Sequence, residues 1–181
     1  MTLRAQLLYK LDKQPVDQIL KVLVRTLSLD PDNAAARILL KKIKNWEAIK
    51  KAGNDAFGAS DWNTAKEKYT EFLTLAEGVP RAKGLSNRAN VFSKLGLYQE
   101  SIIDATAALE ALDTLLFPQN FKSNVTVAEQ RHTAQCAFYV KLYLRRADCY
   151  MKLEQYEEAV RDYQALEEMR PMDRGLFLYT Q

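Results

Sequence analysis

The chain has 181 residues, of which 48% are hydrophobic and 27% charged, as expected for a folded soluble protein. Its net charge of +3 is too small for a dedicated nucleic-acid binder, and no apolar stretch approaches the roughly 20 residues of a membrane span. The length predicts one domain with one continuous core, and only 6 glycines and 5 prolines favour long helices over a turn-rich β architecture.

Residues 1–31 are expected to form a truncated helix pair. The segment LRAQLLYKL would be the remainder of its first helix, and VDQILKVLVRTLSLDPDN its second helix with the closing turn. Such a start leaves an apolar stacking face exposed, so we hypothesise that the chain is a fragment of a longer array. The N-terminus has neither a long apolar core nor a small-residue cleavage pattern, which predicts the cytoplasm, with nuclear access possible.

Residues 32–80 are expected to hold a long linking helix and the first complete repeat. Asp32 and Asn33 are capping residues, and the stretch Ala34–Phe57 has no proline and no glycine until Gly53. At about 1.5 Å per residue, this stretch predicts a helical rod of roughly 35 Å.

Three segments then repeat one pattern of a helix, a short turn, an aromatic residue and a second helix. They are GNDAFGASDWNTAKEKYTEFL, RANVFSKLGLYQESIIDATAAL and RADCYMKLEQYEEAVRDYQAL. The turn aromatics are Trp62, Tyr98 and Tyr156; small residues follow three positions later at Ala65, Ser101 and Ala159; and Tyr69, Ala105 and Tyr163 come four positions after these. A small residue at a helix crossing allows two helices to approach to about 8–10 Å. The pattern predicts an all-α solenoid of antiparallel helix pairs, with a second repeat at 81–113 and a third at 139–171.

An insertion separates the last two repeats. Asn87 and Arg145 occupy equivalent positions but lie 58 residues apart, whereas the expected period is about 34 residues. The excess maps to residues 114–138, where a loop is expected first and a helix from about Val125. We interpret it as a tolerated surface insertion rather than a functional lid. Residues 172–181 are expected to form a tail.

Five polar residues fall on the first helices of these repeats. Lys50 and Asn54 are four residues apart, so they share one helix face, as do Lys141 and Arg145. Asn87 lies on the matching helix of the intervening repeat. First helices line the concave side of a stacked solenoid, which predicts that all five side chains point into one groove. Lysine and arginine donate charge-assisted hydrogen bonds to carboxylates, and asparagine adds neutral donors.

These residues resemble the carboxylate clamp of tetratricopeptide repeat (TPR) domains in chaperone adaptors. The matching motifs are KKAGN for Lys50 and Asn54, LSNRA for Asn87, and VKLYLRRADCY for Lys141 and Arg145. The resemblance implies a right-handed TPR superhelix whose groove binds the acidic, EEVD-type C-terminal tails of Hsp70 and Hsp90.

The similarity narrows to the last TPR block of cytosolic co-chaperones that carry TPRs followed by a J domain (DnaJ or Hsp40 type). The segments YLRRADCYMKLEQYEEAVRDYQAL and SNRANVFSKL carry it, over about Leu23 to Met169. The insertion is longer than the resemblance implies, the tail DRGLFLYTQ does not continue toward a J domain, and the chain has no His-Pro-Asp motif.

Four neighbours of the clamp are candidates for its rim or for a peptide pocket: Phe57, Lys51, Arg88 and Arg146. We interpret the three basic residues as solvated face or rim electrostatics. Phe57 has two equal alternatives, an apolar pocket for the peptide or the core between helices.

No pattern of catalytic residues is present. His132 is the only histidine, Cys136 and Cys149 have no motif for metal binding or nucleophilic catalysis, and there is no glycine-rich phosphate loop. We therefore expect a protein that is not an enzyme, has no cofactor or metal, and binds neither nucleic acid nor membrane. A monomer is expected. The alternatives are a TPR scaffold for a different protein partner and a dimer formed through residues 1–31.

Overall fold

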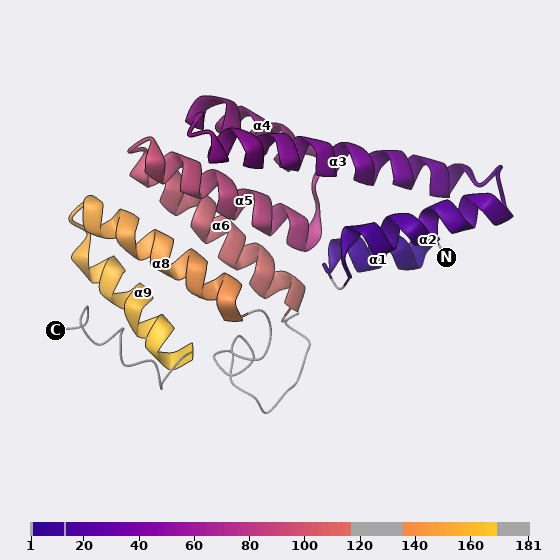
Figure 1. Ribbon diagram of the computed structural model, residues 1–181. Coiled ribbons are helices and arrows are strands. Elements are labelled where there is room, and N and C mark those ends of the chain that lie inside the picture. The colour runs from indigo at the N-terminus through magenta and orange to yellow at the C-terminus, as the bar shows by residue number, and fades with distance from the viewer. Residues whose placement is uncertain (1, 13, 117–135, 170–181) are drawn as a thin grey trace. The chain divides into compact units, whose positions relative to one another are not determined.

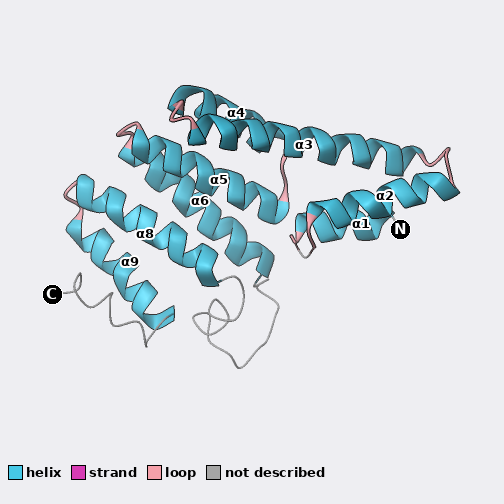
Figure 2. Ribbon diagram, in the orientation of Figure 1, coloured by secondary structure: helices cyan, strands magenta, loops and turns pink. Residues whose placement is uncertain are grey.

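The computed structural model describes residues 2–12, 14–116 and 136–169. Within these ranges the chain is helical apart from short connections and contains no strand, which confirms the all-α prediction (Figures 1 and 2). The helices are α1 (Thr2–Lys10), α2 (Val16–Leu29), α3 (Ala34–Gly58), α4 (Trp62–Leu75), α5 (Gly78–Lys94), α6 (Tyr98–Leu116), α8 (Cys136–Lys152) and α9 (Tyr156–Met169). None of these helices is long and apolar enough to cross a membrane.

The residues group into two compact units, Met1–Gly84 and Leu85–Gln181, instead of the one continuous core expected from the length. The border falls inside α5, four residues after Pro80 and directly after Gly84.

The long helix expected over Ala34–Phe57 is confirmed as α3, which runs one residue further. Asn33 is its N-cap, because the side-chain oxygen accepts a hydrogen bond from the Ala36 N–H at 2.9 Å. Asp61 caps α4 in the same way through the Thr64 N–H at 3.1 Å. These bonds satisfy backbone donors that a helix start otherwise leaves unpaired.

The first unit is built around α3, along whose N-terminal part α1 and α2 form a hairpin (Figure 1). Ile19, Leu23 and Ile43 are fully buried there, and the Tyr9 and Trp46 rings stack at 5.2 Å between centroids. A nine-residue helix such as α1 is unstable alone, so this packing is what keeps it folded. Both helices of residues 1–31 thus lie where the sequence placed them.

The repeat positions are confirmed as contact points between paired helices. Ala65, Ser101 and Ala159 are all fully buried, and the Ser101 hydroxyl donates to the Ala89 carbonyl on the facing helix at 2.8 Å. In the second unit α6 packs on α8, and α8 pairs with α9. The expectations for the insertion beyond residue 116, including a helix from Val125, for His132 and for the tail fall on 117–135 and 170–181, outside the described residues.

Gly78 is the point where the start of α5 touches the end of α1. Its φ is +65°, and a Cβ there would collide with the Lys10 carbonyl. We expect Gly78→Ala to lower the free energy of unfolding by about 2 kcal/mol or more, because it adds backbone strain to a backbone clash. Gly58→Ala is the matched control, because a Cβ at that position meets nothing within 4 Å. Urea denaturation should give an unchanged or slightly higher midpoint for the control; equal midpoints for both variants would contradict the close approach.

Candidate functional site: basic and amide side chains on α3, α5 and α8

In the first unit, Lys50 and Asn54 lie one turn apart on α3. The Lys50 ammonium is already paired: its Nζ lies 2.5 Å from Oε2 of Glu47 and donates to Oε1 at 2.7 Å. Asn54 is exposed, and its Oδ1 accepts a hydrogen bond from the Tyr69 hydroxyl at 2.8 Å. Tyr69 is a buried repeat aromatic of α4, so the paired helix fixes the orientation of the Asn54 amide.

In the second unit, Arg145 of α8 reaches across to α5. Its Nη1 donates to the Ser86 carbonyl at 2.6 Å and to the Ser86 hydroxyl at 2.8 Å. Asn87, the next residue, is half-buried. Lys141 lies one turn before Arg145 on α8 and is exposed. The structure therefore brings Arg145 beside the residue that precedes Asn87, over a separation of 59 residues.

The Arg145 guanidinium is a partly buried charge held by neutral groups. Among the described residues, no carboxylate lies within ion-pair distance of it, and its hydrogen bonds go only to Ser86. Burial lowers the pKa of Arg145 below its ordinary value, only partly offset by Cys149 and Asp148. A guanidinium that has lost water without gaining an acidic partner favours an incoming carboxylate, which supplies charge-assisted hydrogen bonds.

The expectation for Arg88 and Arg146 needs correction, because neither is a solvated rim residue. Arg146 forms a two-pronged ion pair with Asp162 of α9, with Nε–Oδ2 at 2.8 Å and Nη2–Oδ1 at 2.5 Å. Arg88 forms the same pair with Asp104 of α6, at 2.7 and 2.9 Å. Both aspartates are buried. Each arginine is thus used inside its own helix pair, whereas Arg145 donates to Ser86 of α5.

Sequence reasoning missed these aspartates although a signal was present. In each pair the arginine and aspartate are 16 residues apart, and the two pairs lie 58 residues apart, like the repeats that carry them. Registered on the turn aromatics, the first repeat has Ala52 and Lys68 at the corresponding positions, so the pair belongs to two of the three repeats. Burial of both partners fixes how the two helices of a repeat meet.

The other two rim candidates belong to the first repeat. Phe57 meets the turn aromatic Trp62 edge to face, with ring centroids 5.0 Å apart. This contact places Phe57 between the helices of its own repeat, and its half-buried ring keeps one side outward. Lys51 is exposed and pairs with Asp55 one turn later at 2.6 Å. An exposed pair of this kind leaves the ammonium available to a stronger partner.

A sequence profile of the tetratricopeptide repeat matches residues 140–173, the third helix pair of the expected pattern. The chain is also 35% identical over 151 residues to human DnaJ homolog subfamily C member 7, over 82% of this chain and 26% of that protein. The chain belongs to the tetratricopeptide repeat family. This TPR chain thus spans about a quarter of the length of that relative.

Solved TPR structures agree with the fold. The TPR domain of Arabidopsis OM64 is 26% identical, with a TM-score of 0.54 over 77% of this chain and 93% of that chain. The first TPR of Spaghetti (RPAP3), bound to the HSP90 peptide SRMEEVD, is 20% identical, with a TM-score of 0.54 over 76% of this chain and 90% of that chain. At 20% identity, the similarity to the RPAP3 TPR shows a shared fold and nothing more.

The five residues predicted to form a clamp are distributed over both compact units of this TPR chain. Lys50 and Asn54 belong to the first unit, and Asn87, Lys141 and Arg145 belong to the second. Each set lies on the helices that the repeat pattern assigned to it, α3 for the first and α5 and α8 for the second. The gathering of all five around one ligand stays a prediction.

Proposed function

We propose that this TPR chain is a co-chaperone adaptor module that binds the acidic C-terminal tail of Hsp70 or Hsp90. The observation that carries the proposal is Arg145, a partly buried guanidinium held by a carbonyl and a hydroxyl, with no acidic partner among the described residues. The tail offers two kinds of carboxylate, the chain terminus and the acidic side chains. In this proposal the carboxylates are bound by five side chains: Lys50, Asn54, Asn87, Lys141 and Arg145. The proposal also places the protein in the cytoplasm.

The similarity to human DnaJ homolog subfamily C member 7 supports a place among chaperone adaptors. A role in binding rather than catalysis agrees with Cys149, whose buried thiol donates to the Ser101 hydroxyl at 3.3 Å, inside the repeat packing. The mechanism is equilibrium capture of an extended peptide end. Exposed and half-buried charges predict a dissociation constant in the micromolar range, which corresponds to a binding free energy of about −7 to −8 kcal/mol.

Isothermal calorimetry with a peptide ending in Met-Glu-Glu-Val-Asp tests the proposal. We expect micromolar binding that weakens as salt is raised from low to physiological strength, because screening reduces attraction between exposed charges. Amidating the peptide C-terminus should weaken binding at least about tenfold, since it removes one charge-assisted pair. Lys50→Ala should weaken it less, because Glu47 already shares the Lys50 charge. Equal binding of the amidated and free peptides would point to a different groove ligand.

Self-association through residues 1–31 is a second candidate, favoured by the outer face of α1. Leu3 and Leu7 lie one turn apart, with 77% and 57% of their surfaces exposed. In this case light scattering would give a higher mass at higher protein concentration, and Leu7→Glu would restore the monomer mass. A constant monomer mass would exclude it.

A further inference from the structure

The Glu47 carboxylate lies where a ligand carboxylate would have to bind if Lys50 is a clamp residue. Both of its oxygens lie within 2.7 Å of the Lys50 ammonium, and the two side chains are 26% and 32% exposed. Surface pairs of this spacing on a helix usually contribute little and break easily. This pair differs because the carboxylate is also held from a second helix.

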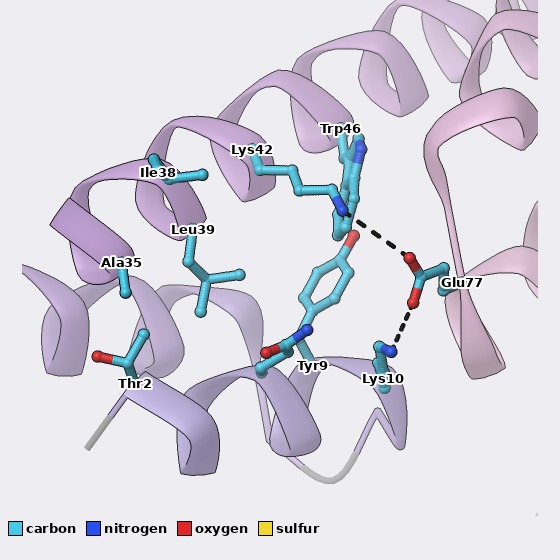
Figure 3. Close-up of a pocket in the computed structure, with 10 residues that line it drawn as sticks. Thr2, Tyr9, Lys10, Ala35, Ile38, Leu39, Lys42, Trp46 and Glu77 are labelled. Carbon is cyan, nitrogen blue, oxygen red and sulfur yellow. Dashed lines mark ion pairs between the residues drawn. The ribbon is translucent and has the colours of Figure 1, made fainter.

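The second hold on Glu47 comes from α1. The Tyr9 hydroxyl donates to Oε1 of Glu47 at 3.4 Å, across 38 residues of chain. Tyr9 is 3% exposed and its ring is stacked on Trp46, so the hydroxyl has little freedom to move. Burial, and then the charge of Glu47, raise the pKa of Tyr9 well above its ordinary value, which keeps the hydroxyl protonated as a donor. Figure 3 shows the Tyr9 ring rising from α1 toward α3.

Other contacts keep α1, and hence Tyr9, in place. Glu77, which precedes α5, pairs with Lys10 at 2.5 Å and with Lys42 at 3.8 Å, so one carboxylate joins α1 to α3 (Figure 3). Asp12 pairs with Lys83 of α5. A cavity of about 320 Å³ beside Tyr9 and Trp46 is lined by the same three charged side chains, Lys10, Lys42 and Glu77. The position of Glu47 therefore depends on the docking of α1, and not on α3 alone.

We propose that Glu47 is an internal competitor for Lys50, which lowers the affinity of this TPR chain for acidic tails and makes that affinity depend on α1. The inference rests on the proposed function and adds its regulation. A tail carboxylate that approaches Lys50 meets a negative charge already fixed beside the ammonium. It must share the three N–H donors of Lys50 with Glu47 and bear the repulsion of that charge.

Glu47→Gln is the decisive variant, because it removes the charge and keeps the size of the side chain and its ability to accept from Tyr9. We expect the peptide ending in Met-Glu-Glu-Val-Asp to bind about three- to tenfold more tightly to this variant than to the wild type, measured by calorimetry at low salt. Glu71→Gln is the matched control. It changes net charge equally on α4, where Glu71 pairs with Lys68 at 2.9 Å, and should alter affinity less than about twofold.

A double-mutant cycle separates competition from a general charge effect. In a Lys50→Met background, Glu47→Gln should give no gain, because the ammonium for which the two carboxylates compete is gone. Tyr9→Phe removes the second hold on Glu47 without touching either charge. It should tighten tail binding up to about threefold in the wild type, because Glu47 is no longer fixed beside Lys50 and is displaced more easily, and change nothing in the Glu47→Gln background.

The outcomes are distinguishable. If the wild type binds the tail and Glu47→Gln binds it equally or more weakly, Glu47 does not compete and this inference is overturned while the clamp stands. If neither protein binds, with helical circular dichroism and unfolding midpoint unchanged, the proposed function fails and the inference falls with it. A gain that survives in the Lys50→Met background would show a long-range charge effect and also overturn it.

Discussion

Arg145→Ala should weaken binding of the acidic tail peptide about 30-fold to 100-fold, the largest loss from any single change in the site. The Arg145 guanidinium is partly desolvated and, within the described part of the chain, donates only to Ser86, so a ligand carboxylate gains a charge-assisted pair that water no longer supplies. Hydrogen bonds to charged groups contribute about 1.5–3 kcal/mol each, which is about 12-fold to 140-fold in affinity and includes this range. Calorimetry with the peptide ending in Met-Glu-Glu-Val-Asp measures the loss.

Two controls make that result specific. Arg161→Ala removes an arginine of α9 whose side chain is 70% exposed and 3.8 Å from Glu157, and it should leave affinity unchanged within about twofold. Arg145→Lys keeps the charge but loses the planar fork, so it should recover only part of the affinity. If Arg145→Ala binds the peptide as the wild type does while remaining folded, the clamp assignment is wrong.

The sequence was sufficient to predict the helices because two periodicities reinforced each other. Within each repeat the apolar residues follow helical spacing, and between repeats the turn aromatic and the small residue return in register. The return of the small residue in each repeat predicted that Ala65, Ser101 and Ala159 are contact points, and all three are buried. Capping residues before α3 and α4 then set where these helices begin.

The chemistry of the candidate site could be predicted only in part, because sequence periodicity does not say which polar side chains find partners. Arg145 and Arg146 are neighbours of one type, yet only Arg146 finds a buried aspartate on the paired helix. A helix turns about 100° per residue, so consecutive side chains leave in different directions. The Tyr9–Glu47 contact, between α1 and α3, has no counterpart in the repeat pattern at all.

Asp162→Ala should destabilise the second unit by about 2–4 kcal/mol, since it leaves Arg146 with an uncompensated charge in a site where its side chain is only 17% exposed. Burial alone would lower the pKa of Arg146, but the hydrogen bonds and charge of Asp162 outweigh it and raise that pKa, so the charged form depends on this partner. Arg146 also donates to Thr106 of α6 at 2.9 Å, so the loss would reach a second helix pair. Urea denaturation followed by circular dichroism measures the effect.

A compensating variant separates the pair from the packing around it. Arg146→Met combined with Asp162→Ala should recover at least half of the lost stability, because no unpaired charge stays buried. Glu157→Ala, at an exposed pair with Arg161, should cost less than about 0.5 kcal/mol. The folded fraction of the Asp162→Ala protein should still bind the tail peptide with wild-type affinity, since Arg145 is untouched. Loss of affinity without loss of stability would instead show that Arg146, held by Asp162, is a ligand of the tail. The assignment of tail binding to Arg145 and of helix pairing to Arg146 would then be wrong.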